Sequence, residues 1–133
     1  MLIDCKFHHI GMAVFDIEKT APYYMEVGYS RTETIIDPIQ NVKICFLHKE
    51  GMPLLELLAP VNDKSPVNRI LENMGVQPYH CCYEVPNIDE AVTYLKRKGF
   101  LLLGKPISAC AMEGKQICFL FNKPVGLIEL VEL

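Results

Sequence analysis

The feature that most constrains the fold is an internal repeat, in which a histidine and a glutamate recur in the same order. Shifting the 133-residue sequence by 71 positions aligns residues 9–29 with 80–100, and His9 falls on His80. Shifting it by 73 positions aligns residues 44–57 with 117–130; seven of these fourteen positions are identical, and Glu56 falls on Glu129. We therefore expect two similar modules, joined into one fold.

Each copy of the repeat carries the pattern of one strand, one helix and three further strands. Asp16 is the expected N-cap of a helix that ends at Gly28, and Asn87 caps the corresponding helix that ends at Gly99. The strands expected after these helices cover 29–36, 42–48 and 53–59 in the first copy, and 100–104, 115–121 and 126–132 in the second. The sequence thus predicts an α+β fold of two βαβββ modules.

A segment without a counterpart in the second copy separates the modules. Ser65 is the expected N-cap of an additional helix over 65–75, with Pro66 at its first position and Gly75 at its end. The length fits one compact domain over residues 1–133. Within it, module one covers about 7–60 and module two about 78–133.

Composition excludes several classes of function. The net charge of −3 gives no sign of a surface for nucleic acid or anionic membrane. No apolar run approaches the roughly 20 residues that span a bilayer. The N-terminal residues do not resemble a signal peptide, and the six cysteines form no CxxC pair. We expect a cytoplasmic protein with reduced cysteines, and neither nucleic acid nor membrane as a partner.

The repeated histidines and glutamates are the candidate metal ligands. A single strand histidine is more often a hydrogen-bonded or surface residue than a ligand. Glu56, however, has Leu54 and Leu58 as neighbours on its own strand face, and Glu129 has equally apolar neighbours. A carboxylate in such surroundings must be paired, neutralised or coordinated, because burying its bare charge costs several kcal/mol.

The donor types indicate which ion these four residues would bind. Imidazole nitrogen and carboxylate oxygen suit Zn²⁺, Ni²⁺, Co²⁺ or Mn²⁺, and the absence of thiolate argues against a closed structural zinc site. We predict that His9, Glu56, His80 and Glu129 bind one divalent metal ion. Such a site leaves coordination positions open for water or substrate, as Lewis-acid chemistry requires.

Three segments resemble the vicinal oxygen chelate superfamily, which includes glyoxalase I and methylmalonyl-CoA epimerase. The resemblance covers nearly the whole chain. Residues 9–14 are similar to the family's opening strand, 54–60 to its second-ligand strand and 126–130 to its closing strand. The insert over 65–75 resembles the linker of methylmalonyl-CoA epimerases.

The resemblance implies a curved, eight-stranded mixed sheet around the metal, with His9, Glu56, His80 and Glu129 as ligands. It implies a metal-dependent enzyme that removes a proton next to a carbonyl and stabilises the resulting enolate. Glu129 is the first candidate for the catalytic base, and Glu56 is the equivalent candidate in the first module. The implied substrate is a small molecule, either an acyl-CoA thioester or a hemithioacetal, and the implied assembly is a homodimer.

One departure from the epimerase pattern leaves alternatives open. Epimerases carry a glutamate, a candidate second base, where this chain has Ile39. Asp37 would replace it only if the loop shifted. The alternatives are a glyoxalase I-like isomerase or lyase, which needs only the metal-site carboxylates, and a non-catalytic protein that binds a small molecule.

Overall fold

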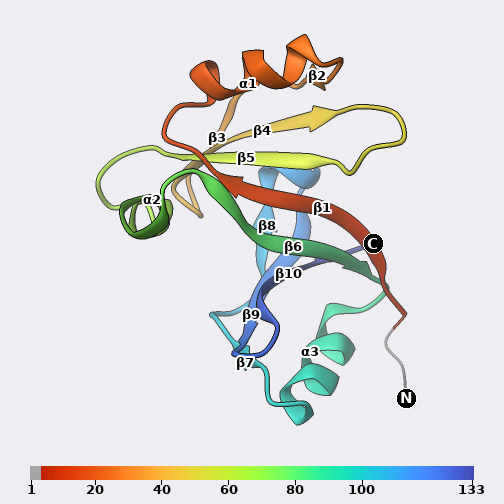
Figure 1. Cartoon of the computed structure of the whole chain (residues 1–133). Coiled ribbons are helices and arrows are strands. Elements are labelled where there is room, and N and C mark those ends of the chain that lie inside the picture. Colours follow the sequence, from red (N-terminus) through yellow and green to blue (C-terminus); the bar gives the residue numbers. More distant parts are fainter. Residues whose placement is uncertain (1–3) are drawn as a thin grey trace. The chain divides into compact units, whose positions relative to one another are not determined.

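The computed structural model describes residues 4–133 and confirms the repeated βαβββ order (Figure 1). The chain divides into two compact units. The first unit is His9–Tyr79, and the second joins His80–Leu133 with the N-terminal residues up to His8. Both boundaries fall inside strands, immediately before the two repeated histidines.

The first unit has a four-stranded order of β2, β4, β5 and β1, and β3 pairs beside β2 on β4. Strands β4 and β5 are antiparallel, whereas β1 and β5 are parallel. Its elements are β1 (Lys6–Ala13, which begins in the second unit), α1 (Ile17–Glu26), β2 (Ser30–Arg31), β3 (Ile35–Asp37), β4 (Val42–His48), β5 (Leu55–Pro60) and α2 (Val67–Met74).

The second unit repeats this order with the equivalent strands β7, β9, β10 and β6, and β8 also pairs with β9. Strands β9 and β10 are antiparallel, and β6 and β10 are parallel. Its elements are β6 (Gln77–Val85, which begins in the first unit), α3 (Ile88–Arg97), β7 (Leu101–Leu102), β8 (Ile107–Ala109), the 3₁₀ helix η1 (Cys110–Met112), β9 (Lys115–Asn122) and β10 (Gly126–Glu132).

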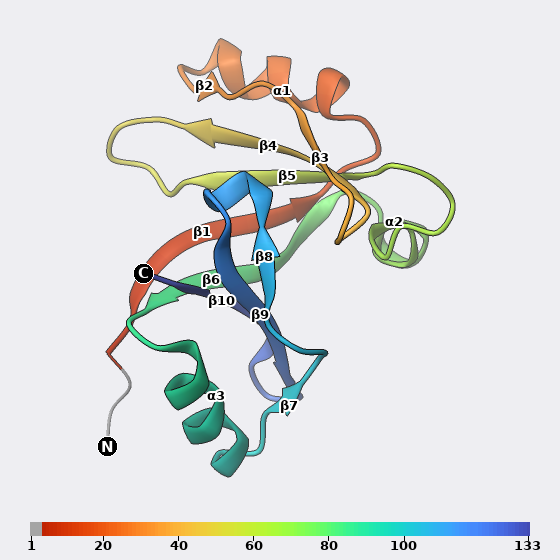
Figure 2. The ribbon, with the colours of Figure 1, turned by 180° about the vertical axis from the view of Figure 1, so that it is seen from behind.

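Each unit packs its helix against one face of its own sheet. In the first unit, Ile17 and Ala21 of α1 join a buried cluster with Leu47 and Leu57 of the strands. Figures 1 and 2 show α1 running along β4 in both views. In the second unit, Ile88, Ala91 and Val92 of α3 pack against apolar residues of β9 and β10. The opposite face of each sheet is therefore left to the candidate ligands.

The two equivalent cysteines belong to these cores. Cys45 and Cys118 are buried, as expected for cysteines used as small apolar residues. Burial raises the pKa of the Cys118 thiol to about 12, and the nearby Glu129 charge adds to this. All six cysteines are free of disulfide bonds.

The helix starts predicted at Asp16 and Asn87 are confirmed. Asp16 accepts from the Glu18 amide at 2.9 Å, and Asn87 accepts from the Glu90 amide at 2.9 Å. The Ile88 amide of α3 also donates to the carboxylate of Glu132 at 2.8 Å, a contact that the sequence did not reveal. A negatively charged group near the N-terminus of a helix stabilises the helix.

The predicted N-cap of α2 is wrong. The cap position is Pro66, without any side-chain hydrogen bond, and the side chain of Ser65 does not cap the helix. Instead, the side chain of Asn68, inside the helix, stabilises the turn before α2. Its amide donates to the backbone oxygens of Asn62 at 2.7 Å and Ser65 at 3.1 Å.

The strand predicted directly after the helix of each module also differs in the structure. The stretch 29–36 becomes β2 and β3, because Thr32 interrupts the ladder by accepting from the Phe46 amide with its side-chain oxygen at 2.9 Å. The stretch 100–104 contains β7 alone, and β8 follows it. The described residues thus form ten strands rather than eight. Within residues 4–133, no helix is long and apolar enough to cross a membrane.

Candidate active site

The first half of the candidate site lies on the two parallel strands β1 and β5. Gly11 of β1 is the register partner of Glu56, and His9 lies two residues earlier on the same strand face. The His9 Nε2 atom is 3.2 Å from Glu56 Oε1, and both side chains are buried. The structure therefore brings together the two ligands predicted in this unit.

The second half repeats this arrangement in the other unit. Cys82 of β6 is the register partner of Glu129, and His80 lies two residues earlier. The His80 Nε2 atom is 3.9 Å from Glu129 Oε2, and both side chains are buried. The equivalence found in the sequence thus holds for strand register and burial.

A phenylalanine covers each pair and was not among the predicted site residues. Phe46 is directly opposite Glu56, and its ring meets that of His9 edge to face at a centroid distance of 5.7 Å. Phe119 is opposite Glu129, and its ring meets that of His80 in the same way at 5.5 Å. The identity of these two positions in the repeat was the signal that could have identified them.

The spacing within each pair suits coordination to one ion. Two ligand atoms about 2.1 Å from a metal lie about 3.0 Å apart at a right angle and about 3.4 Å apart at the tetrahedral angle. The 3.2 Å separation in the first pair falls between these values, and the 3.9 Å separation in the second is somewhat wider. The first pair therefore fits the donor spacing of a divalent metal site, whereas the second pair is wider than either calculated spacing.

Asp37 is the remaining buried carboxylate in the part of the chain described. It accepts hydrogen bonds from the backbone amides of Ile39 at 2.9 Å and Gln40 at 3.1 Å, and from the Gln40 side chain at 2.8 Å. These three donors hold the Asp37 side chain in its own turn. The Ile39 side chain, at the aligned base position, is 62% exposed. This turn therefore offers no acid that is free to move a proton.

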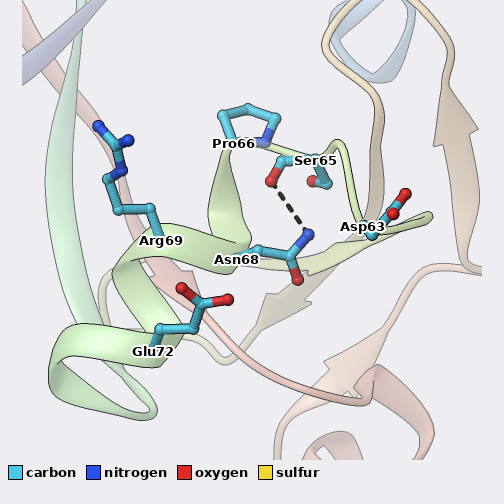
Figure 3. Close-up of a pocket in the computed structure, with 6 residues that line it drawn as sticks. All are labelled: Asp63, Ser65, Pro66, Asn68, Arg69 and Glu72. Atoms are coloured by element: carbon cyan, nitrogen blue, oxygen red, sulfur yellow. Dashed lines mark hydrogen bonds between the residues drawn. The ribbon is translucent and has the colours of Figure 1, made fainter.

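A separate pocket of about 400 Å³ lies beside the first turns of α2 (Figure 3). None of the four candidate ligands lines it. Its lining residues are Asp63, Ser65, Pro66, Asn68, Arg69 and Glu72. The pocket is thus distinct from the histidine–glutamate pairs of the candidate site.

The repeated fold and its two buried histidine–glutamate pairs define a class of protein. Residues 8–119 match the family described as the glyoxalase/bleomycin resistance protein/dioxygenase superfamily. The chain therefore belongs to this superfamily, as the sequence predicted.

Within the superfamily, the chain is similar to methylmalonyl-CoA epimerases. It is 35% identical to the mitochondrial methylmalonyl-CoA epimerase of Homo sapiens over 130 residues, which cover 96% of this chain and 72% of the human protein. It is 32% identical to an ethylmalonyl-CoA/methylmalonyl-CoA epimerase of Cereibacter sphaeroides, with 96% and 98% covered.

The chain is also similar to the solved structure of an epimerase with a bound ligand. A Streptomyces coelicolor methylmalonyl-CoA epimerase variant, bound to 2-nitronate-propionyl-CoA, superposes with a TM-score of 0.82 at 27% identity. The match covers 96% of each chain. The predicted resemblance to the epimerase branch is thereby confirmed.

Proposed function

We propose that this protein is a metal-dependent epimerase that acts on the carbon next to the carbonyl of an acyl-CoA thioester such as methylmalonyl-CoA. The observation that carries the proposal is the pair of buried histidine–glutamate contacts at equivalent positions of the two units. The epimerase relatives support the same reaction.

His9, Glu56, His80 and Glu129 are proposed to bind one divalent ion, with Zn²⁺, Ni²⁺, Co²⁺ and Mn²⁺ as candidates. When bound, the metal supplies Lewis-acid stabilisation of negative charge on the thioester oxygen. Burial of both glutamates supports this assignment, because a buried carboxylate needs a cation or strong donors. The side chains of Phe46 and Phe119 limit water around the two pairs.

Proton transfer is assigned to the two glutamates. Epimerisation removes the α-proton from one face of the substrate carbon and returns a proton to the other, which requires two groups in different positions. Glu129 is the first candidate for the group that removes the proton, and Glu56 is the candidate on the opposite face. Their equivalent positions in the repeat support this division, and the turn at Asp37 supplies no competing base.

The proposal is tested by α-proton exchange. Metal-loaded protein is incubated with each epimer of methylmalonyl-CoA in deuterated water, and NMR follows both deuterium incorporation and inversion. We expect exchange and inversion together, with neither in the metal-free protein. Absence of exchange above background with every candidate metal would refute the proposal.

The absence of a free acid on the Asp37–Asn41 turn favours one second candidate, a glyoxalase I-like isomerase or lyase. This reaction needs only the carboxylates of the metal site. Turnover of the hemithioacetal of methylglyoxal and glutathione, in the absence of methylmalonyl-CoA exchange, would favour it.

The remaining predictions concern a non-catalytic role and the assembly. A protein that only binds small molecules would keep its metal content after the double change of His9→Ala and Glu129→Ala. Homodimer formation is tested by sedimentation, and a cytoplasmic location by fractionation of the source cells.

A further inference from the structure

The turn between β3 and β4 carries a side-chain amide in a fixed orientation. Gln40 is half-buried, and its Nε2 atom donates to Asp37 Oδ2 at 2.8 Å. In this contact the amide nitrogen of Gln40 faces Asp37. The Gln40 carbonyl oxygen therefore points away from Asp37.

Strand register places Asp37, to which this amide donates, on the same sheet face as Glu56. Asp37 is opposite Val42, which in turn is opposite Pro60, whereas Phe46 is opposite Glu56. Opposite residues share a face, and so do residues separated by two or four positions along a strand. Val42 and Phe46 are four residues apart, so the Asp37–Gln40 pair lies about 13 Å along the strands from Glu56.

The equivalent position in the second unit has no such group. There Ala109 replaces Asp37 as the buried end of the short strand, and Met112 of the following 3₁₀ helix is also buried. The two units therefore differ in polarity at this point, although their histidine–glutamate pairs agree.

We infer that Gln40 is a substrate-binding residue whose carbonyl oxygen accepts a hydrogen bond from an amide N–H on the carrier arm of the thioester. The inference rests on the proposed function. A group about 13 Å along the strands from Glu56 is too distant to reach the reacting carbon, but it can reach the amides of a pantetheine-type arm. Asp37 is then a positioning residue that prevents the Gln40 side-chain amide from rotating.

The test compares methylmalonyl-pantetheine with an analogue in which ester oxygen replaces each amide N–H. The proteins are the wild type, Gln40→Leu and the matched control Gln116→Leu, which changes an exposed glutamine of the second unit. We expect Gln40→Leu to raise KM for the amide substrate about 3- to 10-fold, the value of one neutral hydrogen bond, with kcat unchanged. Its KM for the ester analogue should equal that of the wild type.

Asp37→Asn provides the test of positioning. It should raise KM for the amide substrate by a smaller factor than Gln40→Leu, with unchanged kcat, because the Gln40 amide is then free to rotate. The inference is overturned if Gln40→Leu affects both substrates equally, or neither.

A binding measurement separates this inference from the proposed reaction. Calorimetry with the unreactive S-propyl thioether of pantetheine and with its ester analogue needs no turnover. If the difference in binding affinity between these two ligands is lost in Gln40→Leu, the inference is supported even if no α-proton exchanges. If the difference in affinity is unchanged, the inference is refuted. Failure of exchange in the wild type refutes the proposed function alone.

Discussion

His9 and Glu56 form a buried contact of 3.2 Å between imidazole nitrogen and carboxylate oxygen, and His80 and Glu129 repeat it in the other unit. The repetition of this contact at equivalent positions supports the metal site proposed above.

Removal of one histidine should release the metal. Removing a residue that only hydrogen-bonds to a metal ligand weakens metal affinity about 10- to 100-fold. Removing the ligand itself, as in His9→Ala, should therefore weaken metal affinity by more than about 100-fold. His80→Ala should act alike if one ion is shared. Metal content after gel filtration, measured by mass spectrometry, checks this, with the exposed His48→Ala as control. Retention of one equivalent by both variants would contradict a shared site.

Glu129→Gln should slow proton transfer while keeping an oxygen that can bind metal. General-base catalysis contributes about 10²- to 10⁴-fold, so kcat for deuterium exchange should fall within that range at saturating metal. Glu113→Gln, a change at an exposed position of the same unit, serves as the control. A fall of less than tenfold in Glu129→Gln would exclude this residue as the base.

The sequence was sufficient for the repeat, for the two histidine–glutamate pairs that the structure buries and for the two helix caps at Asp16 and Asn87, because each depends on local pattern or on identity between the copies. The sequence was insufficient to predict element boundaries that depend on a side-chain hydrogen bond to the backbone. Thr32 divides the expected strand by accepting from the Phe46 amide, and Asn68 organises the start of α2 in place of Ser65. Side-chain hydrogen bonds of this kind leave no periodic signal in the sequence.

Ile39→Glu tests whether the reaction lacks a base on the β3–β4 turn. The position is 62% exposed, so the substitution should not disturb folding. If Glu56 and Glu129 transfer both protons, the ratio of inversion to exchange should change less than about threefold, a difference below 1 kcal/mol. Ile39→Gln is the neutral control. A large gain in inversion for the glutamate variant alone would show that the wild-type turn lacks a needed base.

Cys118 should make stability fall at alkaline pH. Its pKa is raised from 9.0 to about 12 in the folded state, first by burial and then by the charge of Glu129. The folded state thus favours the neutral thiol, and this contribution is present below pH 9 and is lost as pH rises toward 12. Urea unfolding between pH 8 and 11 should show a smaller alkaline loss for Cys118→Ala than for wild type or Cys110→Ala. Equal slopes in all three proteins would contradict it.

Ser65→Ala should stabilise the fold. The Ser65 side chain is buried, and its hydroxyl has no hydrogen-bond partner within residues 4–133. Because an unsatisfied buried hydroxyl costs roughly 1 kcal/mol, its removal should raise the melting temperature by about 4 °C. Ser108→Ala is the matched contrast, since the Ser108 hydroxyl donates to the Gly114 oxygen at 2.8 Å and its loss should lower the melting temperature slightly. Calorimetry of the two variants checks the opposite signs; destabilisation by Ser65→Ala would mean that the Ser65 hydroxyl binds ordered water.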